Sequence, residues 1–166
     1  MTKEKSTAVK PTHLNALKKV TPASTREDAN PAFAHLINLP VVSDPRGDLT
    51  FLEGRRHVPF DIRRVYFLYN VPVESERGGH AHRELEQVIF ALSGSFRITT
   101  DDGKQKREHW LRNPRQGLHI NRMVWREMDS FSQGAVCMVV ASEYYDENDY
   151  YRDYDAFIRA VSENRP

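Results

Sequence analysis

Apolar and polar residues alternate over short stretches through the middle of the chain, between residues 34 and 142. A period of two over about four to eight residues indicates half-buried β-strands rather than helices. Seven stretches follow this pattern: residues 35–39, 49–52, 63–70, 86–92, 95–100, 104–110 and 135–141. Many short strands at close intervals predict an all-β sandwich or barrel.

The breaks between these stretches contain residues typical of turns. Asp102-Gly103 is the strongest hairpin signal, because glycine supplies the positive φ that a tight turn needs. We therefore expect residues 95–100 and 104–110 to pair. The other breaks are Asp44-Pro45-Arg46-Gly47, Val71-Pro72, Ser93-Gly94 and Asn113-Pro114.

The pattern changes to a helical one near the end of the chain, where residues 148–162 predict the single confident helix. Asp149 and Asp153 would lie near its positive end, which favours the helix dipole. Its apolar face, which we expect to pack against the β-domain, consists of Tyr150, Tyr154, Phe157, Ile158 and Val161.

Residues 1–33 differ from the rest of the chain. They are rich in lysine, contain three prolines and have few large apolar residues. This composition predicts a mobile extension, with one short helix over residues 12–20, ahead of a domain spanning residues 34–166. The alternative is an arm that packs on a partner subunit.

Composition narrows the class of protein. The 166 residues suit one domain, and 24 basic against 23 acidic residues give a net charge of +1, which argues against electrostatic binding of nucleic acid. No apolar run is long enough to span a bilayer, and no secretory signal is visible. The single cysteine, Cys137, excludes a disulfide framework and a cysteine-based zinc cluster. We expect a cytoplasmic protein.

The strongest chemical signal is His80-Ala81-His82, which follows Gly78-Gly79. Two histidines two positions apart on a strand face the same side, and Glu86 keeps that parity if no bulge intervenes. Such a set suits either a metal site or proton transfer to a bound substrate. The plainer alternative is a pair of surface histidines on a loop.

His80, His82 and Glu86, followed by a strand and Gly94, are similar to the first motif of the cupin superfamily. In the second cupin motif a histidine completes the metal site, and Arg126 takes that position here. A guanidinium has no free lone pair and cannot ligate a metal, so this substitution argues against a metal cupin. His119 lies nearby in the sequence but out of register.

A larger ordered set of motifs resembles the sugar 3,4-ketoisomerase family of bacterial deoxysugar and glycan biosynthesis, including O-antigen sugars. The resemblance covers roughly residues 34–160 and rests on Arg46-Gly47-Asp48-Leu49, residues 60–66, residues 77–82, Leu85-Glu86-Gln87, residues 92–95, residues 101–103, residues 124–127 and residues 141–147. It implies a cupin jelly roll that forms a homodimer, often by exchange of N-terminal strands. It also implies a metal-independent, cofactor-free isomerase that moves the ketone of a dTDP-linked 4-keto-6-deoxyhexose from C4 to C3.

By this resemblance, His80 is the general base at C3, and His82 assists or shuttles protons. Two imidazoles suit such a reaction because their pKa lies near neutrality. Tyr66 and Arg77 are assigned to stabilise the enediolate, with Arg126 as a weaker candidate. Tyr66 has core packing as its alternative. The diphosphate needs cations, for which the candidates are Arg46, Arg64, Arg77 and Arg97. His119, Trp125 and Arg126 complete the predicted substrate-binding residues.

Three other functions stay open on sequence alone. A cupin 3,5-epimerase of the same sugar nucleotide also removes a proton beside a ketone. A metal-dependent cupin oxygenase would use His80, His82 and Glu86. A non-catalytic module would bind the sugar nucleotide without turning it over.

Overall fold

The computed structural model describes residues 33–163. The expectations of a mobile extension and a short helix before this range lie outside the described residues, apart from Phe33, which is buried. No helix within the described range is long and apolar enough to cross a membrane.

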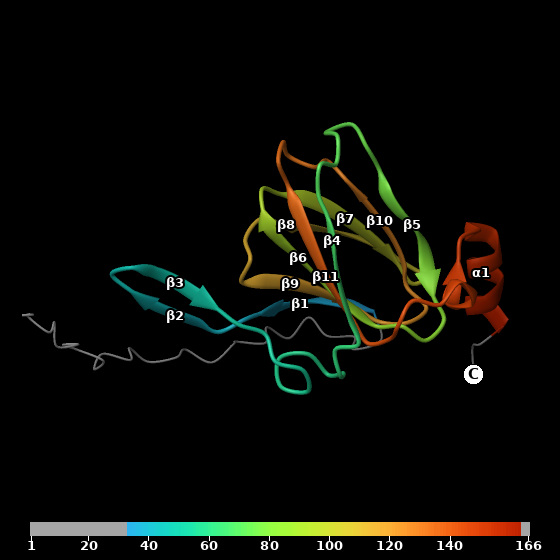
Figure 1. Ribbon diagram of the computed structural model, residues 1–166. Coiled ribbons are helices and arrows are strands. Elements are labelled where there is room, and N and C mark those ends of the chain that lie inside the picture. Colours follow the sequence, from blue (N-terminus) through green and yellow to red (C-terminus); the bar gives the residue numbers. More distant parts are fainter. Residues whose placement is uncertain (1–32, 164–166) are drawn as a thin grey trace, which may run out of the picture.

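Two antiparallel sheets face each other in the described part of the chain (Figure 1). The first has the order β1-β9-β6-β11-β4, made of β1 (Ala34–Asn38), β9 (Gln116–Ile120), β6 (Gln87–Ser93), β11 (Val136–Ala141) and β4 (Arg64–Leu68). The second has the order β12-β5-β10-β7-β8, made of β12 (Tyr150–Tyr151), β5 (Arg77–His82), β10 (Trp125–Asp129), β7 (Phe96–Asp101) and β8 (Lys106–Leu111).

The main hydrophobic core lies between the two sheets. It takes alternate residues from both, such as Ile89 and Leu118 from the first sheet and Ile98 and Met128 from the second. The period-two pattern in the sequence has this origin, because alternate side chains of a strand point to opposite faces. The architecture is the predicted cupin jelly roll.

A second core covers the outer face of the first sheet. Val88, Phe90 and Val140 pack there beneath Val58 and Phe60 of the segment between β3 and β4. Before that segment, β2 (Val41–Asp44) and β3 (Gly47–Thr50) form a hairpin that extends away from both sheets (Figure 1).

The C-terminal helix packs on the outer face of the second sheet. The helix α1 (Tyr154–Glu163) follows the 3-10 turn η1 (Glu147–Asp149) and β12. Its Phe157 is fully buried against Ala81 of β5 and Trp125 of β10. The helix therefore supports the strand that carries His80 and His82 from behind.

The predicted helix over residues 148–162 is wrong at its start. The Asp153 side chain accepts a hydrogen bond from the Ala156 N–H at 2.7 Å and caps α1, so the helix begins at residue 154. Residues 147–151 form η1 and β12 instead.

The strand predictions are confirmed with shifts of a few residues at their ends, and the Asp102-Gly103 hairpin joins β7 to β8 as expected. Five strands of the described range lie outside the seven predicted stretches, namely β2, β5, β9, β10 and β12, although His80 and His82 of β5 are expected on a strand. Each is short and carries glycine, charged or polar residues in place of a clear alternating run.

Candidate active site

The two histidines lie on the inner face of β5. The neighbouring residue, Ala81, belongs to the cluster under α1, so His80 and His82 on either side of it point between the sheets. Their rings are 4.9 Å apart, edge to face. His82 is 1% exposed and His80 is half-buried, which makes His80 the more accessible of the two.

Gly78 allows β5 to lie close to β10. A Cβ atom at this position would be 2.7 Å from the Arg126 carbonyl oxygen, and its φ of +86° is one that side-chain-bearing residues rarely adopt. The register shifts at this point, so that His80 pairs directly with Arg126 of β10. Opposite residues of an antiparallel pair share a face, so Arg126 also points inward.

The Arg126 guanidinium is completely buried. Its Nη1 donates to the His80 carbonyl oxygen at 3.4 Å, but Nε and Nη2 find no hydrogen-bond partner within residues 33–163. Burial lowers the pKa of Arg126 to about 10, so it is still charged at neutral pH. A buried cation with two unpaired donors is expensive to maintain and points to an anionic or oxygen-bearing ligand.

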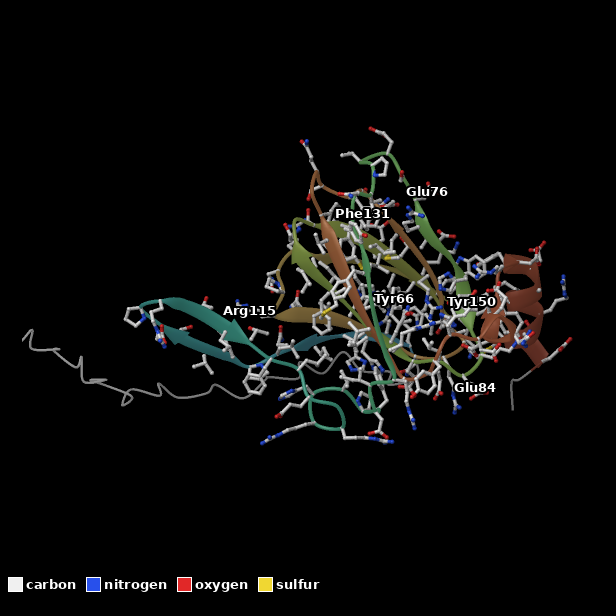
Figure 2. All side chains as sticks on the ribbon, in the orientation of Figure 1. Tyr66, Glu76, Glu84, Arg115, Phe131 and Tyr150 are labelled. Carbon is white, nitrogen blue, oxygen red and sulfur yellow. The ribbon has the colours of Figure 1, made fainter. Side chains whose placement is uncertain are left out.

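Tyr66 enters the site from β4 of the opposite sheet, and Figure 2 shows it over the interior between the sheets. Its hydroxyl donates to Gln87 Oε1 at 3.4 Å, a long contact. Burial raises the pKa of Tyr66 to about 12, so the phenol is protonated and can donate. The guanidinium of Arg64 lies 5.3 Å from the Tyr66 ring.

Tyr150 and Asp149 close the site from the C-terminal segment. Tyr150 pairs with His82 across β12 and β5, and its ring lies 5.0 Å from that of His80 and 4.3 Å from that of His82. The Asp149 Oδ2 atom lies 2.8 Å from His82 Nδ1. Figure 2 places Tyr150 at the side of the sheet next to α1.

Both imidazoles are uncharged at neutral pH. Burial, together with the Arg126 cation, lowers the pKa of His80 to about 4. Burial and the same cation also hold the pKa of His82 well below its usual range. The site thus combines two neutral proton acceptors, a buried cation and a phenol donor, which suits removal of a proton beside a carbonyl and stabilisation of the resulting oxyanion.

Arg97 and Trp125 do not belong to this site. Both lie on the outer face of the second sheet, because their strand neighbours Ile98 and Arg126 face inward. Arg97 is held by Asp129 at 2.8 Å and by Glu108 at 3.1 Å. Trp125 packs under α1 instead of stacking on a substrate.

His119 and Glu86 pair with each other, away from the histidines of β5. His119 is on the face of β9 that contacts Phe60, outside the space between the sheets. Its Nε2 lies 3.1 Å from Glu86 Oε2. The expected parity of Glu86 with His80 and His82 is wrong, because β5 ends at His82 and the chain turns before β6.

Arg46 and Arg77 are both exposed, and neither has a recorded interaction with the histidines of β5 within the described chain. Arg46 lies in the turn of the β2–β3 hairpin, where Asp44 holds it at 2.5 Å. Arg77 begins β5, three residues before His80, which corresponds to about 10 Å along a strand. The structure therefore groups His80, His82, Tyr66, Arg64 and Arg126, and leaves Arg46, Arg77, Arg97, His119 and Trp125 outside the group.

The family model described as "WxcM-like, C-terminal" (FdtA) matches residues 33–162. The chain is 44% identical, over 127 residues, to the TDP-4-oxo-6-deoxy-alpha-D-glucose-3,4-oxoisomerase of Aneurinibacillus thermoaerophilus, which covers 76% of this chain and 91% of that protein. The chain belongs to the sugar 3,4-ketoisomerase family.

Solved structures agree with this assignment. A variant of the 3,4-ketoisomerase QdtA from Thermoanaerobacterium thermosaccharolyticum, in complex with TDP-4-keto-6-deoxyglucose, is 40% identical with a TM-score of 0.77, covering 79% of this chain and 95% of that one. A dTDP-4-dehydrorhamnose 3,5-epimerase from Bacillus anthracis has a TM-score of 0.66 at 17% identity, covering 80% and 81% of the two chains. The second likeness shows a shared fold alone. The protein is thus an enzyme, a sugar-nucleotide 3,4-ketoisomerase.

Sequence reasoning missed three residues of this ketoisomerase site: Asp149, Tyr150 and Gln87. The first two were assigned to a helix because their spacing to Tyr154 and Phe157 is helical. The signal that could have corrected this is Asp153, a good N-cap residue directly before Tyr154. Gln87 takes the inward face that the parity argument gives to its neighbour, Glu86.

Proposed function

We propose that this ketoisomerase converts TDP-4-keto-6-deoxyglucose into the 3-keto isomer through an enediolate. The observation that carries the proposal is the pair of neutral, inward-facing imidazoles of His80 and His82 beside the buried Arg126 cation. The printed substrate of the curated relative, and the sugar nucleotide bound to the QdtA variant, support this choice of substrate.

The reaction has two proton movements. Moving the ketone from C4 to C3 transfers one hydrogen from C3 to C4 and another from the C3 oxygen to the C4 oxygen. Between these transfers the negative charge lies on the oxygens of an enediolate. A site for this chemistry needs a base near C3, a group that moves a proton between the oxygens, and fixed positive charge or donors near the oxygens.

The two histidines fit the two movements. His80 is the more accessible; in this proposal it takes the proton from C3 and then returns a proton to C4. His82 lies deeper, in contact with Asp149, and moves the proton between the two oxygens. This division keeps the roles that the family resemblance implied.

Arg126 and Tyr66 stabilise the enediolate in this proposal. The unpaired Nε and Nη2 donors of Arg126 supply hydrogen bonds to the oxyanion. In bulk solvent, water molecules would provide these hydrogen bonds. The Tyr66 phenol, from the opposite sheet, supplies a further donor. Charge that develops during the reaction therefore meets donors already in position.

The diphosphate is held by Arg64 at the edge of the site. Its Nε is buried without a partner in the described chain, and its guanidinium lies between the rings of Tyr66 and Tyr145, at 5.3 and 5.5 Å. A planar guanidinium fixed by two aromatic rings suits bidentate contact with phosphate oxygens.

The reaction proceeds without a metal in this proposal. The metal site predicted from the sequence would need Glu86, whose side chain is engaged by His119 on the outer face of the first sheet. Residues 33–163 contain no group of three histidine, cysteine or carboxylate side chains placed to hold a metal ion. Arg126, a cation, interacts electrostatically with His82 and with Tyr66 of β4. Turnover at the untreated rate after exhaustive dialysis against a chelator would support this, and loss of activity that added metal restores would refute it.

The enzyme acts as a homodimer in this proposal. Val65, Phe67 and Tyr69 expose 46%, 49% and 66% of their surface along β4, an edge strand. They form an apolar face suited to a second copy. The hairpin that extends from the sheets (Figure 1) offers a further surface to such a copy. Sedimentation of the wild type as a dimer and of Phe67→Glu as a monomer would support this, and a monomeric wild type would refute it.

Product NMR tests the function. The purified protein is incubated with TDP-4-keto-6-deoxyglucose, and ¹³C spectra identify the position of the ketone. A carbonyl at C3 supports the proposal. A ketone retained at C4 with inverted C3 or C5 would show a 3,5-epimerase, and bound but unchanged substrate would show a non-catalytic module.

A further inference from the structure

Asp149 and His82 form a buried hydrogen-bonded pair at the end of β5. The Oδ2 and Nδ1 atoms are 2.8 Å apart, and the side chains are 13% and 1% exposed. An ionised carboxylate can only accept a hydrogen bond, so the imidazole proton must be on Nδ1. The lone pair of the neutral ring is then on Nε2.

The carboxylate of Asp149 is itself fixed by main-chain contacts. Its Oδ1 accepts the N–H of Glu84 at 2.8 Å, and the Asp149 carbonyl accepts the N–H of Arg83 at 2.9 Å. The next residue, Tyr150, pairs with His82 in the sheet. Both carboxylate oxygens are thus engaged, and the segment is attached to the turn that follows β5.

The other ring nitrogen of His82, Nε2, is buried without a hydrogen-bond partner in the described chain. The groups that interact electrostatically with His82 are basic residues: Arg126, His80, Arg64 and Arg152. Tyr150 packs on its ring. An imidazolium in such surroundings is strongly disfavoured unless a carboxylate compensates for it, and Asp149 is in contact with the ring.

We propose that Asp149 is a positioning residue for His82: its carboxylate holds the ring with the proton on Nδ1, presents Nε2 to the substrate as the acceptor, and stabilises the imidazolium that forms when Nε2 takes a proton. The inference rests on the proposed ketone migration. In the oxygen-to-oxygen step, the O3–H bond breaks, its electron pair stays on O3, and the proton forms an N–H bond at Nε2. That bond then breaks as the proton passes to O4.

His80 differs from His82 in this respect. Its side chain contacts no carboxylate within residues 33–163, and it is the more accessible ring. The two histidines are therefore not interchangeable, and the loss of Asp149 should affect the chemistry of His82 specifically.

Two Asp→Asn variants, each of which removes one negative charge from the same segment, test the positioning role of Asp149. Asp149→Asn keeps an oxygen for the Glu84 N–H but removes the charge, and its amide can donate to Nδ1, which favours the tautomer protonated on Nε2. We expect kcat to fall on the order of 10²-fold with little change in KM. The control is Asp146→Asn in the same segment, where Asp146 caps η1 through the Asn148 N–H at 2.9 Å. It should leave kcat unchanged, whereas equal losses in both variants would indicate a structural role and overturn the inference.

Imidazole ¹⁵N NMR gives a readout that a structural role would not move. The His82 signals, assigned by their loss in His82→Asn, should show a protonated Nδ1 and an unprotonated Nε2 in the wild type, and this state should be lost in Asp149→Asn. A wild-type ring protonated on Nε2 overturns the inference even if the Asn variant fails to fold. If the wild type makes no 3-keto product but shows the expected tautomer, the proposed function fails while the positioning of His82 by Asp149 is supported.

Discussion

Arg126 shows how one buried residue defines the chemistry of the site. Its side chain is 0% exposed, and transfer of an unpaired cation into a protein interior costs several kcal/mol. The fold maintains it between two neutral imidazoles and a protonated tyrosine, where it lowers the pKa of His80. Arg126 also stands where the second cupin motif has a metal-ligating histidine, so this position holds a fixed cation that suits an oxyanion.

Tyr66→Phe removes one of the donors proposed for the enediolate. The hydroxyl makes only a long contact with Gln87 at 3.4 Å, so we expect the thermal midpoint to change little. Loss of one oxyanion donor typically lowers kcat on the order of 10²-fold. The control is Tyr69→Phe, two residues along, where the ring is 66% exposed. Steady-state kinetics with equal rates for Tyr66→Phe and Tyr69→Phe would contradict the assigned role.

Strand parity explains which site residues could be predicted. Arg64 and Tyr66 share parity, as do His80 and His82, and each pair faces the interior together. Trp125 and Arg126 are neighbours on one strand and cannot both face a substrate. Strand parity cannot predict the environment of Arg97, because its ion pairs with Asp129 and Glu108 form only when β7, β8 and β10 are side by side.

At the scale of elements, the position of β5 decides the site. Helix α1 supports its outer face through Ala81 and Phe157, and the inner face carries the histidines. Close approach to β10 depends on Gly78. The sequence predicts the long alternating strands well. It does not predict β12 or the start of α1, because a helical spacing of aromatic residues continues across a break that only the Asp153 cap marks.

The adjacent glycines Gly78 and Gly79 give a matched test of whether the close approach of β5 to β10 matters. Gly78→Ala would place its Cβ 2.7 Å from the Arg126 carbonyl oxygen, whereas Gly79→Ala meets nothing within 4 Å; both have positive φ. We expect each to lose about 1–2 kcal/mol of stability from backbone strain. Gly78→Ala should also lose activity on the order of 10²-fold, since it separates His80 from Arg126. Unfolding in urea and kinetics measure both effects, and equal activity of the two variants would show that the close approach is unimportant.

At the scale of the whole molecule, buried histidines link stability to pH. Burial lowers the pKa of His35, His80, His82, His109 and His119 below that of an unfolded chain. The unfolded state therefore binds more protons below about pH 6.5, and the free energy of unfolding decreases as the pH falls through that value.

This link predicts a steep acid destabilisation. Each such histidine contributes up to about 1.4 kcal/mol per pH unit below its unfolded pKa, and for His80 the effect should extend to its folded pKa of about 4. Urea unfolding between pH 7.5 and 4.5 measures the slope. His80→Asn should reduce this slope by the contribution of one histidine. A free energy of unfolding that does not change with pH over this range would contradict the account.

The exposed face of β4, which we propose as a dimer interface, is difficult to predict from the sequence. Parity places Val65, Phe67 and Tyr69 on one face of β4. Only the fold shows that β4 is an edge strand, and that the segment with Val58 and Phe60, which covers Val88, leaves these side chains exposed. Arg46, which has no recorded interaction with the histidines of β5 within the described chain, lies on the hairpin that extends from the sheets.

The most direct test of the central claim is exchange of the C3 proton of TDP-4-keto-6-deoxyglucose in deuterated water, followed by ¹H NMR. The wild type should wash out the C3 proton and form the 3-keto sugar. His80→Asn should still bind the sugar nucleotide, because the amide has a similar size, but should lose exchange on the order of 10²–10⁴-fold, because it cannot take a proton. His82→Asn should retain C3 exchange while forming product slowly. Normal C3 exchange in His80→Asn would show that another residue begins the reaction and would contradict the account.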